Sequence, residues 1–168
     1  MSSLEDLYRE VILDHYRAPR NRGELDCPPA FKSEGKNPVC GDELTLYLKI
    51  DGDVVSDVKI SGSGCSISMA SASMMSVAIK GKKIEEAREL ISSFKELMNI
   101  HESKLETGNK SQSQADSSDA LKLGELDALT GVVKFPVRIK CATLAFNTLG
   151  NGLDSAQGVS KPAVASTE

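Results

Sequence analysis

Two consecutive runs of alternating apolar residues constrain the fold of this chain more than any other feature. The first run covers residues 44–50 and the second covers residues 54–60, with Asp51-Gly52-Asp53 between them. Alternation with a period of two is typical of half-buried strands, and a short glycine-containing link predicts an antiparallel hairpin. A three-residue loop gathers the apolar side chains on one face, whereas a two-residue loop sets them against charged residues. The predicted pairs are then Leu44 with Ile60, Leu46 with Val58, and Ile50 with Val54.

This register also predicts which residues meet at the far end of the hairpin. Extended backwards, it sets Cys40 opposite Gly64, so that Cys65 lies beside Cys40 at about 5 Å, the spacing of neighbouring strands. Asp42 adds a carboxylate oxygen close to both thiols. We therefore expect a shared site at the end of the hairpin opposite the Asp51-Gly52 turn.

Helical periodicity marks four further segments, in which apolar residues recur at three- and four-residue spacings. These segments are residues 4–17, 66–80, 84–98 and 136–149. Gly81 and Gly150 follow the second and the fourth segments, where glycine commonly ends a helix. One short extended piece is expected around Phe31. The predicted fold class is α+β, with a small antiparallel β-sheet packed against helices.

Residues 1–150 are predicted to form a single domain, because one core commonly serves about 100–200 residues and 40% of the chain is hydrophobic. Within it, residues 103–120 hold almost no apolar side chains, so they cannot bury enough surface to offset the entropy lost on ordering. We interpret them as a mobile insertion. Residues 151–168 are interpreted as a polar, disordered tail.

Charge and cysteine content narrow the functional classes. A net charge of −4 with 4% aromatic residues disfavours a nucleic-acid surface, which needs basic and stacking side chains. No apolar run approaches the roughly 20 residues that span a bilayer, so no membrane segment is expected. Four cysteines are few for a disulfide framework, and the N-terminus does not resemble a signal peptide, which predicts a cytoplasmic protein. We expect proteins or a metal as partners.

Three of the four cysteines lie where a thiolate is favoured. Cys40 lies in a turn-forming segment next to Gly41 and close to Asp42. Cys65 precedes a predicted helix, whose positive end lowers the pKa of a thiol. Cys141 follows Arg138 and Lys140 on the last predicted helix. Three sulfurs and one carboxylate would complete a tetrahedral zinc-type shell.

Spacing alone leaves the role of these cysteines open. The sequence has no C-x-x-C pair, and geometry does not place Cys141, which lies far along the chain from Cys65. Free cysteines often act as small buried hydrophobes, and we expect this of Cys27. A stand-alone thiol enzyme is disfavoured, because neither His15 nor His101 has a cysteine or carboxylate at a useful spacing.

Four motifs resemble those of the U-type iron–sulfur cluster assembly proteins. They are Y-x3-I-x-D-H-Y-x2-P-R-N-x-G (8–23), N-P-V-C-G-D (37–42), G-S-G-C-S-I-S (62–68) and P-V-R-I-K-C-A (136–142). The general scaffold branch has histidine before its third cysteine, where this chain has Lys140. Lysine at that position and an insertion around residues 100–125 resemble the SufU-type branch instead.

The resemblance implies an IscU-like fold and a zinc site formed by Cys40, Asp42, Cys65 and Cys141. It implies that Cys40 accepts sulfur from a pyridoxal-phosphate cysteine desulfurase of the SufS type and that downstream cluster-assembly proteins receive it. If the chain is an enzyme, it is at most a zinc-dependent sulfurtransferase that acts with this partner. The alternative is a scaffold on which iron, as a transient 2Fe–2S cluster, is assembled on the same residues.

Overall fold

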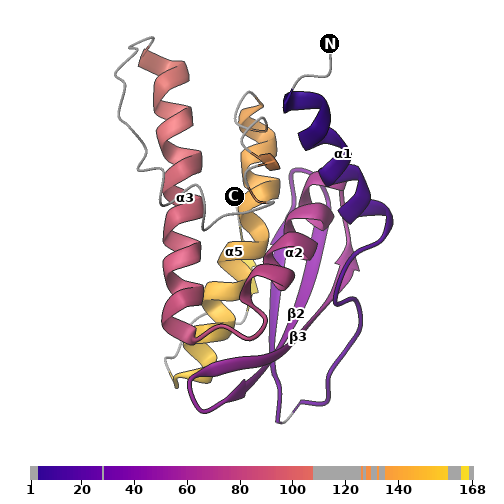
Figure 1. The fold of residues 1–168 in the computed structure, drawn as a ribbon, viewed down its shortest axis with the longest axis vertical. Helices are drawn as coiled ribbons and strands as arrows, with labels where there is room; N and C mark the ends of the chain where they lie inside the picture. Colours follow the sequence, from indigo (N-terminus) through magenta and orange to yellow (C-terminus); the bar gives the residue numbers. More distant parts are fainter. Residues whose placement is uncertain are drawn as a thin grey trace.

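The protein is described here by a computed structural model, which covers residues 4–27, 29–107, 126, 128–129, 132, 135–158 and 164–166 (Figure 1). Its elements are α1 (Leu4–Arg17), β1 (Phe31–Asn37), β2 (Asp42–Asp51), β3 (Val54–Ser63), α2 (Ser66–Ile79), α3 (Ile84–Thr107), α5 (Pro136–Ala156) and β4 (Val164–Ser166). The sheet order is β3-β2-β1-β4. The first three strands pair antiparallel, and β4 pairs parallel with β1. The predicted α+β class is confirmed.

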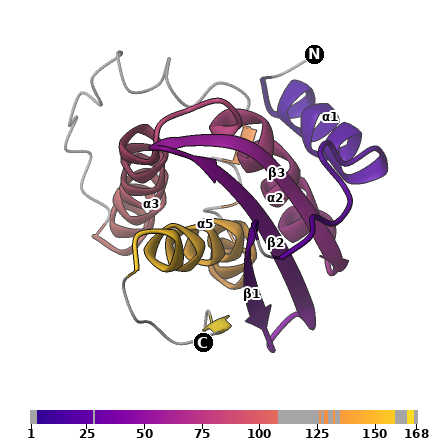
Figure 2. The ribbon, with the colours of Figure 1, turned by 90° about the horizontal axis from the view of Figure 1, so that it is seen from below.

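The helices form a second layer on the sheet (Figure 2). Helix α5 packs on β1 and β2, α2 packs on β3 and on α5, and the outer helices α3 and α1 contact α5 and α2 respectively. Phe94 of α3 stacks on Phe146 of α5, with the ring centroids 4.0 Å apart. None of the helices in the described ranges is long and apolar enough to cross a membrane.

From Lys49 back to Glu43, the register of the β2–β3 hairpin differs from the prediction by two residues, and at the turn it differs by one. Leu46 pairs with Ile60, and the turn has two residues rather than three, since Asp51 pairs with Val54. Gly52 of the turn has φ +65°, which glycine adopts without strain. The register then shifts at Lys49 and Ile50, whose partners are Asp57 and Val55, so Ser56 is an extra residue in β3. This bulge restores the apolar side chains to one face.

Because the error is two residues, the buried face of the hairpin is still the predicted one. Leu44 and Ile60 are buried, although Leu44 lies opposite Gly62, and Val55 replaces Val54 in the core. The pairing at the cysteine end does change. One step beyond the last observed pair, Asp42 rather than Cys40 lies across from Gly64.

The last helix is longer than predicted. Helix α5 continues through Gly150 and Gly152 to Ala156, so the first six residues of the predicted tail are helical. Leu153 is fully buried and extends the apolar stripe of α5 by one turn. Gly152 lies against Leu48 of β2, where a side chain would not fit without movement. Close packing on the sheet therefore outweighs the low helix propensity of glycine.

Two other segments differ from their predictions. Helix α3 extends to Thr107, which makes the first five residues of the predicted insertion helical; residues 108–120 lie outside the described residues. Val164–Ser166 of the predicted tail forms β4 beside β1. The extended piece expected around Phe31 is confirmed and is a full strand of seven residues, β1.

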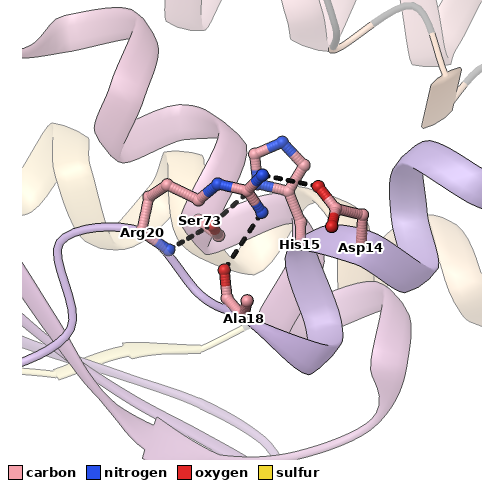
Figure 3. A network of polar contacts seen from close by, with 5 residues as sticks. All are labelled: Asp14, His15, Ala18, Arg20 and Ser73. Atoms are coloured by element: carbon pink, nitrogen blue, oxygen red, sulfur yellow. Dashed lines mark hydrogen bonds and ion pairs between the residues drawn. The ribbon is translucent and has the colours of Figure 1, made fainter.

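A polar network fastens the end of α1 to α2 (Figure 3). His15 is buried, and its Nδ1 lies 2.8 Å from Ser73 Oγ, which also accepts a hydrogen bond from the Arg20 backbone N–H at 2.8 Å. The Arg20 guanidinium pairs with Asp14 at the surface. His15 is thus a packed histidine of the contact between α1 and α2.

Candidate metal centre

Three elements bring Cys40, Asp42 and Cys141 together. Cys40 lies in the β1–β2 turn, Asp42 begins β2, and Cys141 lies in the first turns of α5. One ligand atom from each of the three residues lies within 4.8 Å of the other two. The two sulfurs are 3.1 Å apart. The packing of α5 on β1 and β2 thereby joins two cysteines that sequence geometry could not connect.

Cys65 lies next to this group through Asp42. Its backbone N–H donates to Asp42 Oδ1 at 2.8 Å, and its thiol lies 3.9 Å from Asp42 Oδ2. The sulfur also accepts a hydrogen bond from the Ser68 N–H and so caps the N-terminus of α2. The sequence prediction placed Cys65 directly beside Cys40. The observed register instead puts Asp42 against Gly64. There the Cys65 N–H holds the Asp42 carboxylate close to Cys40 and Cys141.

Gly64 is required for this arrangement. An added Cβ there would lie 2.5 Å from Asp42 Oδ1. Since real Cβ atoms do not approach an oxygen so closely, any side chain at this position would displace the Asp42 carboxylate.

Asn37 is a site residue that the sequence analysis missed. It ends β1 opposite Asp42 and is fully buried. Its Nδ2 lies 3.3 Å from Asp42 Oδ2 and 3.3 Å from Cys141 Sγ, so one amide can donate to both groups. Its Oδ1 has no hydrogen-bond partner in the described part of the chain, which is uncommon for a buried polar atom. Asn37 opens the N-P-V-C-G-D motif, but its role at the site follows only from β1 and its register with β2.

The electrostatics of the group favour a bound cation. Burial, with the neighbouring Cys40 thiol, raises the pKa of the Cys141 thiol above its usual range. The charges of the nearby thiolates, chiefly that of Cys65, raise the pKa of Arg138. A buried thiolate therefore needs a positive group beside it. Arg138 provides one positive charge at the edge of the group, as its position before Cys141 suggested.

The donor set fits a zinc-type ion. Two sulfurs and a carboxylate oxygen are already clustered, and Cys65 can supply a third sulfur from the position next to Asp42. The same thiolates suit an iron–sulfur cluster. All four cysteines are free, and Cys27 is exposed in the segment between α1 and β1, so our expectation of a buried Cys27 is wrong.

The sequence model of the family described as "NifU-like N terminal domain" matches residues 7–142. The chain belongs to this family. The resemblance to the U-type assembly proteins is thus confirmed.

Individual relatives cover nearly the whole chain. The chain is 45% identical to the "Zinc-dependent sulfurtransferase SufU" of Bacillus subtilis, over 94% of this chain and 96% of that protein. It is 41% identical to the "Iron-sulfur cluster assembly scaffold protein IscU" of Streptococcus pyogenes, over 89% and 84% of the two chains. A crystal structure titled as a putative scaffold protein for the SUF system of Fervidobacterium islandicum covers 90% of this chain and 99% of that one, at 33% identity and a TM-score of 0.72.

Proposed function

We propose that this protein accepts persulfide sulfur from a pyridoxal-phosphate cysteine desulfurase and carries it for iron–sulfur cluster assembly. The observation that carries the proposal is the contact of the half-buried Cys40 with the buried Cys141 beside Asp42. The similarity to the zinc-dependent sulfurtransferase SufU supports it. Four free cysteines are consistent with work in the reducing cytoplasm.

Zn²⁺ would be held by Cys40, Asp42, Cys65 and Cys141. When bound, it would keep the thiols ionised and link the segments that carry them. Asn37 would hold the Asp42 carboxylate and the Cys141 sulfur in place, as outer hydrogen bonds commonly do around metal ligands.

Cys40 is the proposed sulfur acceptor. Cys141 is fully buried on α5, and Cys65 is fixed as the N-cap of α2. Cys40 instead lies in a turn next to Gly41, whose φ of +69° and open surroundings allow the backbone to adjust. Cys40 can therefore swing toward a partner while the other donors remain.

Sulfur transfer to Cys40 is an exchange without a net redox change. The Cys40 thiolate attacks the outer sulfur of the persulfide on the partner, a new S–S bond forms on Cys40, and the S–S bond on the partner breaks. The partner's cysteine leaves as a thiolate and is protonated from solvent. Cys40 then carries the persulfide to the next acceptor.

The decisive test is mass spectrometry after incubation with a cysteine desulfurase encoded in the same genome and cysteine. We expect the extra sulfur on a Cys40-containing peptide, and we expect Cys40→Ser to abolish acceptance. Cys27→Ser is the matched control, since Cys27 lies outside the group and should not change the yield. Full acceptance by Cys40→Ser would refute this assignment.

A scaffold function is the second candidate, because the S. pyogenes relative is named an IscU scaffold and the same thiolates can hold a cluster. The visible absorption spectrum separates the two. A scaffold reconstituted with iron and sulfide is coloured and passes its cluster to an apoprotein, whereas a zinc-bound carrier stays colourless. Metal analysis of protein purified without added metal complements this test.

A further inference from the structure

A cavity of about 390 Å³ lies next to the metal centre, between the end of α1 and the end of β3. Leu44, Ile60 and Met69 give it apolar walls, and the stretch from Ser61 to Gly64 contributes the β3 side. A volume of this size is within the range of binding pockets.

Two arginines, Arg17 and Arg22, line the cavity. Both are exposed, and neither forms an ion pair in the described part of the chain. Arg20, between them in sequence, is instead paired with Asp14 (Figure 3). Among the described residues, no acidic side chain lines the cavity. Two guanidinium groups beside apolar walls favour a ligand that has both carboxylate groups and apolar parts.

The cavity also borders an open strand edge. Strand β3 is at the edge of the sheet, and its outer side meets only the isolated bridges of Ile60 with Arg22 and of Val54 with Lys83 in the described residues. Ser61–Ser63 therefore has no outer neighbour within that part of the chain. An exposed edge accepts an extended peptide through backbone hydrogen bonds.

The arginine side of the cavity is held in place. The Asn21 carbonyl accepts a hydrogen bond from the Ile60 N–H at 2.9 Å, and the Gly23 N–H donates to the Ile60 carbonyl at 3.0 Å. The Asn21 side chain also donates to Ser76 of α2 at 3.0 Å. A ligand would thus find a preformed site, which lowers the entropy lost on binding.

The position of the cavity connects it to sulfur transfer. Gly64 lines the cavity and lies against Asp42, and Cys65 is the next residue. A peptide segment bound in this cavity would therefore lie close to the candidate ligands.

We propose that this cavity docks an extended, acidic segment of the desulfurase that delivers sulfur to Cys40. The inference rests on the proposed function. The apolar walls and the strand edge favour a peptide over a small inorganic anion, and the arginines select carboxylates. The contact would hold the partner while its persulfide reaches the cysteine group.

The test is the Kd of the zinc-loaded protein for the desulfurase, measured by titration calorimetry for the wild type and for Arg17→Glu/Arg22→Glu. The double variant should bind about tenfold more weakly, because two favourable charge contacts become repulsive. Its zinc content should be unchanged. Arg9→Glu on the same helix is the matched control, since Arg9 is exposed but does not line the cavity. If the charge reversal impairs folding, the milder variant Arg17→Gln/Arg22→Gln replaces it. This variant should lose affinity in the same direction but by a smaller factor.

The inference is overturned, and the proposed function left intact, if both double variants keep the wild-type affinity and sulfur transfer. The same holds if their binding is weakened no more than that of Arg9→Glu. Millimolar inorganic phosphate that binds the cavity without competing with the desulfurase would also overturn it, in favour of a small-anion site. If the wild type accepts no sulfur from the desulfurase, the proposed function itself fails.

Discussion

The Asn37 side chain lies between two residues of the candidate metal centre. Its Nδ2 donates toward both the Asp42 carboxylate and the Cys141 sulfur, each at 3.3 Å. Loss of a hydrogen bond outside the ligand shell commonly weakens metal affinity by about 10–100-fold. We predict this loss of zinc affinity for Asn37→Ala, measured by competition with a chromogenic chelator.

The control for this prediction is Asn21→Ala. It also removes a side-chain amide hydrogen bond, but that bond goes to Ser76 and not to a proposed ligand. It should lower stability without changing zinc affinity. Equal zinc affinity in Asn37→Ala and the wild type would show that the amide serves folding alone.

The ligands themselves should differ in importance. Asp42→Ala should weaken zinc binding less than substitution of Cys40, Cys65 or Cys141 by serine, because a carboxylate oxygen is replaceable by water whereas thiolates provide most of the affinity. Metal content after dialysis against a weak chelator checks this order. Unchanged zinc content in Cys141→Ser would remove Cys141 from the site.

Sequence reasoning at the residue scale found the donor types but not their full arrangement. Cys40, Asp42 and Cys65 are near one another along a hairpin, so local pairing predicts their proximity. Cys141 reaches the group only through the packing of α5 on β1 and β2, and Asn37 only through the β1–β2 register. Such long-range contacts depend on tertiary packing, which periodicity does not encode.

At the scale of elements, the contact of α5 with the sheet gives a paired prediction. Gly152→Ala should destabilise the protein by about 1–3 kcal/mol, because overpacking is costly and the added Cβ would lie 2.8 Å from Leu48 Cδ1. Gly150→Ala should stabilise it by about 0.5–1 kcal/mol, since alanine is a better helix former and nothing lies within 4 Å of the new methyl. Urea unfolding of both variants checks the opposite signs. The same sign for both would show that packing on Leu48 does not determine the effect.

The hairpin shows the limit of sequence prediction for an element. Alternation determined which face is buried, and that face is correct. A bulge changes the register without changing the apolar pattern, so Ser56 could not be recognised as the extra residue. Likewise, Gly150 led us to predict a helix end too early. The packing of α5 on β1 and β2, which extends the helix past this glycine, cannot be recognised from the local sequence.

At the scale of the whole molecule, an ion held by the four proposed ligands would join the β1–β2 turn, the start of α2 and the start of α5. A ligand that binds only the folded state stabilises it, by about 4 kcal/mol when its free concentration is a thousand times Kd. Removal of zinc should therefore lower the melting temperature by roughly 10 °C. Differential scanning calorimetry with and without a chelator checks this, and the Cys65→Ser variant should show a smaller difference. An unchanged melting temperature would place the metal outside the folded core.

The wide separation of the proposed ligands along the chain has a consequence for biosynthesis. Cys65 precedes Cys141 by 76 residues, which a ribosome adds in about 4–15 s. During that interval the nascent chain presents Cys40 and Cys65 without the helix that completes their surroundings. If the four proposed ligands hold zinc, complete metal loading follows translation of α5, and until then the early thiols are open to oxidants and to competing ions.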